Sequence, residues 1–171
     1  MAKRRKLVVI AAAIAGVAAS VTGSALAAQT PLITLPTPDW VDKGNDVYVC
    51  QSPRCGKGSV LSYNDVAAVP FLDNMVNGPN FSGKAIVNLI SRSFEKRTGY
   101  GPIAISSSAT RRVKDYTEVL ASGTAVVHGK TAGFATAYMI GPGDDVFVDT
   151  LGASVMTATH NLAVALHSAG Y

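Results

Sequence analysis

The period of the hydrophobic and polar positions changes along the chain, and these changes divide it into predicted helices and strands. From about residue 83 to 98, apolar residues recur at helical spacing. The residues on this predicted apolar face are Ile86, Leu89, Ile90 and Phe94. Ser82 is a suitable N-cap and Gly99 a suitable C′ residue, so we expect a helix between them.

After this helix the period becomes two, which is typical of half-buried strands. The alternating segments read "PIAISSS", "KDYTEVLAS", "GTAVVHG", "TAGFATAYMI" and "DDVFVDTL". Gly129-Lys130 and the stretch 141–144 carry turn residues between them. Strands joined by tight turns pair antiparallel, because a parallel pair needs a long crossover.

Two further regions complete the predicted order of elements. "DVYVC" and "GSVLSY" flank a loop rich in glycine, serine and proline and predict a hairpin, while residues 64–80 fit either a short helix or an ordered loop. The end of the chain predicts a second helix with Val155, Leu162 and Leu166 as its buried stripe. The fold class is therefore α+β, an antiparallel sheet of about five to seven strands with two main helices, in the order hairpin, helix, strands, helix.

The segment "TAYMIGPGDDVFVDTLGAS", a strand pair followed by the terminal helix, resembles the closing part of the α-β-α sandwich of PsbP-like proteins. The order of elements over about 120 residues is similar as well. The resemblance includes no diagnostic motif, so it assigns no functional residue. It implies an extrinsic accessory or binding protein, and it leaves the two cysteines unexplained.

The N-terminus has the three parts of a secretory signal peptide. A charged start, Lys3 to Lys6, precedes the apolar run 7–21, and Ala25-Leu26-Ala27 offers small residues to a signal peptidase. The alternative is a retained membrane anchor, but the run is shorter than the roughly 20 residues of a spanning helix. We expect a bacterial signal peptide over residues 1–27, a proline-rich extended arm over 28–39, and a single α+β domain over 40–171.

Cleavage after Ala27 changes the charge of the protein. The chain has 15 Lys and Arg against 11 Asp and Glu, and four of these cations belong to the leader. The mature chain of 144 residues is therefore neutral, so the basic pI gives no support for nucleic-acid binding. We expect a periplasmic or extracellular protein without a membrane span after cleavage.

The only two cysteines, Cys50 and Cys55, have four residues between them. Disulfides persist in an oxidising compartment, so we expect a structural disulfide that clamps the hairpin loop. A redox centre is the alternative, because Arg54 and Lys57 would favour a thiolate, although the usual spacing is two residues. Two cysteines without a nearby histidine are too few ligands for zinc, and we expect no metal site and no cofactor.

The densest cationic cluster of the mature chain is Arg111, Arg112 and Lys114. Arginine grips carboxylate or phosphate bidentately, so this cluster is a candidate surface for an anionic small ligand or a partner. The alternative is a solvated turn or strand face. His128 occupies the tip of a predicted hairpin and is a second candidate, although an exposed turn residue is the simpler interpretation.

The remaining histidines and acidic residues give weaker support for a functional site. His160 and His167 are seven residues apart, which is too far for two helical metal ligands. The acids Asp144, Asp145 and Asp149 lack EF-hand spacing. We therefore expect a non-catalytic binding or accessory module for an unknown envelope or extracellular partner. The alternatives are a small hydrolase that uses His128 with a nearby Ser or Asp, and a structural protein of the cell envelope.

Overall fold

The structure is a computed structural model and describes residues 35, 38–44, 46–79, 82–113 and 115–171. These residues form one seven-stranded antiparallel sheet. Its strands are β1 (Trp40–Asp42), β2 (Val47–Cys50), β3 (Val60–Ala67), β4 (Ile103–Val113), β5 (Tyr116–Val127), β6 (Lys130–Ile140) and β7 (Asp144–Gly152). They lie in the order β1-β2-β3-β7-β6-β5-β4, so β1 and β4 form the two ends of the sheet. The predicted leader lies outside the described residues.

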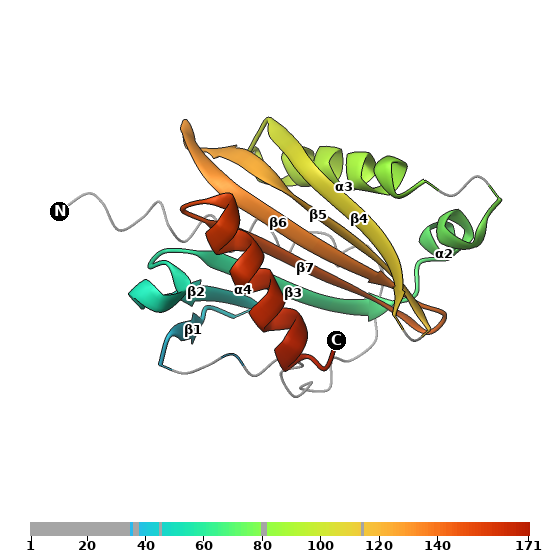
Figure 1. The fold of residues 1–171 in the computed structure, drawn as a ribbon, viewed down its shortest axis with the longest axis horizontal. Helices are drawn as coiled ribbons and strands as arrows, with labels where there is room; N and C mark the ends of the chain where they lie inside the picture. Colours follow the sequence, from blue (N-terminus) through green and yellow to red (C-terminus); the bar gives the residue numbers. More distant parts are fainter. Residues whose placement is uncertain (1–34, 36–37, 45, 80–81, 114) are drawn as a thin grey trace.

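Helices cover both faces of the sheet and create three layers (Figure 1). One face carries α3 (Gly83–Thr98) and the shorter α2 (Pro70–Asn77), and the other carries α4 (Val155–Ser168). A hydrophobic core lies under each layer of helices. The predicted α+β class and the predicted order of elements are confirmed, and α2 fills part of the segment that the sequence left open.

The local signals of α3 act as predicted at both ends. Ser82 accepts a hydrogen bond from the backbone N–H of Ala85, and Gly99 adopts a left-handed conformation with a φ of 67°. The prediction that Leu89 belongs to the core is wrong, because this residue remains 43% exposed. Successive residues of a helix are about 100° apart, so Leu89 falls outside the stripe centred on Ile90.

In α4, Ser154 caps the N-terminus and accepts a hydrogen bond from the N–H of Thr157 at 3.1 Å. Leu162 and Leu166 are buried against the sheet as predicted, and Val155 is half-buried. The single tryptophan, Trp40, belongs to the same core. α4 therefore seals the face of the sheet that α3 leaves open.

The predicted segments "KDYTEVLAS" and "GTAVVHG" were separate units in the sequence, but residues 116–127 form the single strand β5. Gly123 does not interrupt it. A Cβ at Gly123 would lie 2.0 Å from the carbonyl oxygen of Ala104, so the glycine allows β4 to approach β5 closely. β4 also continues past the serines to Val113, so Arg111 and Arg112 lie on a strand.

Cys50 and Cys55 form a disulfide with a Cα–Cα distance of 5.9 Å. The bridge closes the loop between β2 and β3, as expected for a structural staple, and both residues are buried. The side chain of Asn161 on α4 donates a hydrogen bond to the carbonyl oxygen of Cys55 at 3.0 Å. The disulfide loop is therefore tied to the last helix of the chain.

Candidate binding surface

The structure separates the two arginines of the predicted cationic cluster. Arg111 lies opposite Glu118 on β5, and Arg112 lies opposite Thr117. Neighbouring residues of a strand point to opposite faces of the sheet, so the two guanidinium groups cannot grip one ligand together. Arg112 donates to the hydroxyl of Thr117 at 2.7 Å. Lys114, the third member of the predicted cluster, lies outside the described residues.

Arg111 forms an ion pair across the strands. Its Nε donates to Oε2 of Glu118, a carboxylate that is only 1% exposed, while the Arg111 side chain is 63% exposed. The hydrogen bond to Glu118, assisted by the charge of the carboxylate, raises the pKa of Arg111 above its ordinary value. The negative charge of the buried carboxylate is thus balanced by Arg111, and the remaining guanidinium nitrogens of Arg111 face solvent.

This ion pair lies at the rim of a groove of about 250 Å³ between α4 and the strands β4 and β5, which we call the α4-side groove. The residues that line it are Arg111, Glu118, Leu120, Thr159, Leu162, Ala163, Leu166, His167 and Tyr171. Its lining combines aliphatic side chains with the exposed cation of Arg111, the imidazole of His167 and the buried carboxylate of Glu118. An apolar lining with a few polar groups is the composition of a binding site.

The C-terminal residue borders the α4-side groove. The backbone N–H of Tyr171 donates to the carbonyl of Leu166 at 3.0 Å, and its ring meets the ring of Tyr116 edge to face at 5.8 Å. The hydroxyl of Tyr116 donates to Oδ1 of Asp144 at 2.5 Å, which raises the pKa of Tyr116. These contacts hold the end of the chain beside Arg111 and shape the wall of the groove.

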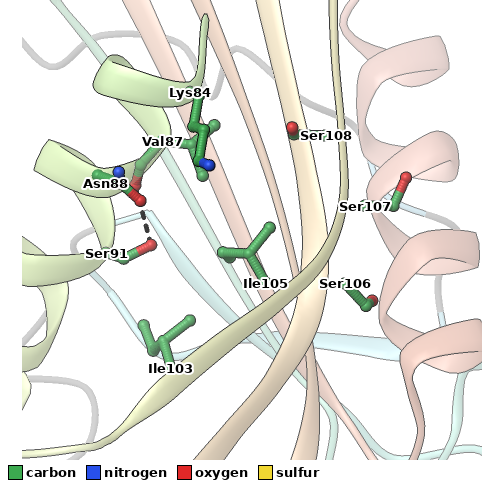
Figure 2. A pocket seen from close by; sticks show the side chains of 9 residues that line it. All are labelled: Lys84, Val87, Asn88, Ser91, Ile103, Ile105, Ser106, Ser107 and Ser108. Atoms are coloured by element: carbon green, nitrogen blue, oxygen red, sulfur yellow. Dashed lines mark hydrogen bonds between the residues drawn. The ribbon is translucent and has the colours of Figure 1, made fainter.

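A second groove, of about 470 Å³, lies on the opposite face between α3 and β4, and we call it the α3-side groove. The residues that line it are Lys84, Val87, Asn88, Ser91, Ile103, Ile105, Ser106, Ser107 and Ser108. Figure 2 shows the α3 side chains on one wall, with Ile103, Ile105 and Ser108 directed towards them and Ser107 directed away. Strand β4 therefore has a groove on each face.

His128 is not among the residues that line either groove. It occupies the β5–β6 turn with a φ of 51°, followed by Gly129 at 75°, as in a type I′ hairpin turn. Its side chain is exposed, and its ring packs edge to face against Tyr100 at 5.3 Å. Arg111 and His128 lie near opposite ends of the β4–β5 ladder, about 30 Å apart at roughly 3.3 Å per residue. The predicted site residues therefore do not form one site.

The acidic residues do not converge on a cation site. Asp144 faces Tyr116 on the α4 side, whereas Asp145 accepts hydrogen bonds from the N–H groups of Val69 and Gly141. Among the described residues, no three His, Cys, Asp or Glu side chains gather as ligands for a metal ion.

Sequence reasoning missed the residues of α3 that line a groove, notably Lys84 and Asn88. They flank the apolar stripe at a spacing of four residues, which is a signal that the sequence contains. What the sequence did not contain is the position of β4 at the end of the sheet, which leaves this flank uncovered. Glu118 was missed because its pairing with Arg111 depends on the strand register.

The sheet between two layers of helices defines the class of the fold, which is a PsbP-like α-β-α sandwich. A solution structure of cyanobacterial PsbP (CyanoP) from Synechocystis sp. PCC 6803 matches it with a TM-score of 0.55 at 9% sequence identity. The match covers 77% of this chain and 81% of that chain. No protein-family model matches the chain, and none of the curated proteins matches it in sequence. The resemblance seen in the sequence is thus confirmed at the level of the fold.

In the part of the chain that the structure describes, no helix has the length and hydrophobicity that a membrane crossing requires.

Proposed function

We propose that this protein is an exported, non-catalytic binding module that acts as an accessory to a protein partner outside the cytoplasm. The N-terminal pattern of charged, apolar and small residues supports export. The buried disulfide agrees with an oxidising compartment. The PsbP-like fold supports an accessory role, because that is what the resemblance implies.

The observation that carries the proposal is the Arg111–Glu118 ion pair at the rim of the α4-side groove. Only Nε of Arg111 is used by Glu118, so its terminal nitrogens are available to grip a carboxylate of the partner. The aliphatic floor below, which includes Leu162 and Leu166, accepts apolar side chains. We therefore expect the partner to present an acidic residue beside an apolar one.

The hydrolase alternative depends on His128. A catalytic histidine needs a base or acid partner within hydrogen-bond reach and a cleft for the substrate. His128 is exposed at a turn, packs on Tyr100, and makes no hydrogen bond within the described part of the chain. Its position favours the binding module over the hydrolase.

The test is photo-crosslinking in cells that produce the protein. A photoreactive residue at Thr159, inside the α4-side groove, should give one adduct with another protein, whereas the same residue at the exposed Lys57 should give none. Arg111→Gln, whose amide can still donate to Glu118, should reduce the adduct several-fold, because the guanidinium fork is lost. Arg112→Gln is the matched control, since Arg112 lies on the opposite face.

Intact mass of the captured protein reads out its export in the same experiment. We expect a chain cut after Ala27 whose mass is lower by two hydrogens because of the disulfide. An uncut chain with both thiols reduced, or an adduct that forms equally from Lys57 and Thr159, would contradict the proposal.

A further inference from the structure

Strand β4 presents an open edge. It forms one end of the sheet, pairs with β5 on one side, and pairs with no other strand among the described residues. Residues 104–110 read "AISSSAT" and are exposed except for Ile105, which is half-buried, and they include no proline and no charge. Natural edge strands are usually short, charged, bulged or interrupted by proline, since an open edge invites another strand. Over residues 104–110 β4 has one such feature, the bulge at Ser106, and its remaining edge is open to a further strand.

The neighbouring flank of α3 carries complementary polar side chains. Lys84, Asn88, Ser91 and Glu95 follow one another at spacings of four, three and four, so they form one stripe beside the core residues. Lys84 makes no ion pair within the described part of the chain. Oε1 of Glu95 accepts a hydrogen bond from the N–H of Ile103 at 2.6 Å. Oε2 of Glu95 accepts no hydrogen bond from the residues that the structure describes.

Helix α3 runs antiparallel to β4. The start of α3 lies at Thr110, because a Cβ on Gly83 would fall 2.2 Å from the Thr110 hydroxyl, and its other end lies at Ile103 through Glu95. A helix rises about 1.5 Å per residue, so Lys84 and Glu95 are about 16 Å apart along α3. Lys84 lines one end of the α3-side groove, and Glu95 lies on α3 one turn past Ser91, beyond the residues that line the groove.

We propose that a second copy of this chain binds along β4 and α3, related by a two-fold axis that passes near Ser106 and Ser107. The two β4 strands pair antiparallel, and the two α3 helices meet antiparallel above them. Lys84 of each copy then faces Glu95 of the other, and Asn88 faces Ser91. The two sheets join into one continuous sheet, and the two α3-side grooves close on each other.

The register of this pairing agrees with the facing of the side chains. Residues directly opposite each other in an antiparallel pair share a face. β4 shifts register against β5 between Ile105 and Ser107, and Ser106 is the extra residue. After the shift, Ser108 shares the α3 face with Ile103 and Ile105. Thr110 lies on the same face, because its hydroxyl is next to Gly83 of α3. The proposed axis places Ser108 opposite Ile105, and Thr110 opposite Ile103, of the second copy.

The spacing of the helices sets how closely the two copies approach. α3 packs on β4 and β5, and Phe94 also packs on Phe134 of β6 with 5.4 Å between the ring centroids. Strands are about 4.8 Å apart, so two α3 axes placed over the β4–β5 boundary would be about 9.6 Å apart. Packed helices are typically about 8–10 Å apart. Contact between the two helices therefore requires α3 to lie towards β4 in the dimer.

A second copy is favoured over a segment of another protein by this self-complementarity of charge. A two-fold axis places Lys84 of each copy opposite Glu95 of the other, which gives two ion pairs. The assembly also closes, because the outer ends of the joined sheet are the two β1 strands, which have only three residues each. The α4-side groove lies on the opposite face and stays open, so the dimer and the proposed partner use different surfaces.

Sedimentation of the purified protein over a range of concentrations tests the proposal. The wild-type protein should form a dimer. Lys84→Glu and Glu95→Lys should each raise the dimer Kd by roughly a hundredfold, because each places like charges opposite each other twice. A mixture of the two variants should form a heterodimer as tight as the wild type, because both contacts again join opposite charges.

Lys130→Glu is the matched control, because it makes the same change of charge at the exposed end of the β5–β6 turn and should leave the dimer unchanged. If Glu95→Lys lowers the thermal midpoint, Glu95→Gln keeps an acceptor for Ile103 and should still prefer the Lys84→Glu variant over itself. A protein that stays monomeric at its highest soluble concentration, or a mixture no tighter than either variant alone, would overturn the proposal. Backbone amides of β4 that exchange equally fast in monomer and dimer would do the same.

Discussion

At the scale of single residues, Asp145 shows a buried carboxylate with a structural task. It is fully buried, and its two oxygens accept the N–H of Val69 at 2.7 Å and that of Gly141 at 3.3 Å. It thereby joins the start of α2 to the β6–β7 turn. Burial raises its pKa, and the two backbone hydrogen bonds oppose that effect only in part. Ionisation of Asp145 in the folded protein therefore lowers the free energy of unfolding.

This cost predicts a pH dependence. A group whose pKa is higher in the folded protein contributes stability that is fully present below its unfolded pKa, about 3.8, and is lost as the pH rises through its folded pKa. The free energy of unfolding should therefore lose the contribution of Asp145 as the pH rises above 4. Asp145→Asn, which does not ionise, should remove this component. Urea unfolding of both proteins over this pH range measures it, and parallel curves would contradict the assignment.

At the scale of elements, the pairing of β4 with β5 depends on a residue without a side chain. Gly123 faces Ile105 on β4, and an added Cβ would approach backbone atoms of both Ala104 and Ile105 at 2.9 Å or less. Backbone cannot rotate away as a side chain can. The glycine is therefore required where the register of β4 shifts.

Gly123→Ala should lower the free energy of unfolding by about 2 kcal/mol or more, because β4 must move away from β5 to admit the methyl group. Gly143→Ala is the control, since a Cβ there meets nothing within 4 Å and should change stability little. Chemical denaturation of the two variants gives the comparison. Equal stability would show that β4 is not held at this distance.

The elements that the sequence predicted well carry their signals locally. α3 has its N-cap, its apolar stripe and its C-terminal glycine within one stretch, so its bounds follow from residues 82–99 alone. β5 was divided at Gly123, because a glycine weakens a strand pattern in the sequence, while the contact that explains it comes from β4. Information that lies on another strand is not visible to a local pattern.

The candidate site was predictable to a smaller extent for the same reason. Arg111 was identified from its charge, but its pairing with Glu118 and its place beside α4 depend on register and on the order of strands. The separation of Arg111 from Arg112 follows from strand alternation once both are known to lie on β4. The two described members of the predicted cationic cluster are therefore one residue that lines a groove, Arg111, and one on the opposite face, Arg112.

At the scale of the whole molecule, the two ends of the described chain stabilise each other. Asn161, which is 1% exposed, donates to the carbonyl of Cys55 across 106 positions of sequence. A Cβ on Gly56 would lie 2.7 Å from the Thr157 methyl carbon, so the disulfide loop and α4 are in close contact. The staple acts on the interface with α4 as well as on its own hairpin.

Asn161→Ala should therefore destabilise the protein by about 1–3 kcal/mol, because the carbonyl of Cys55 loses its donor in a buried site. Removing the disulfide with Cys50→Ser and Cys55→Ser should cost roughly 2 kcal/mol from loop entropy. Combined, the changes should cost less than their sum, since both act on one contact. Thermal unfolding of the single and combined variants measures this, and full additivity would argue against coupling.

The contact between Asn161 and Cys55 also bears on when the disulfide forms during folding. β7, which pairs with β3, and α4, which covers the loop, both lie far downstream of β2 and β3 in the sequence. Contacts so distant in sequence form slowly. Cys50 and Cys55 therefore stay open to an oxidant until α4 docks, and its docking shields the finished bond from later reduction.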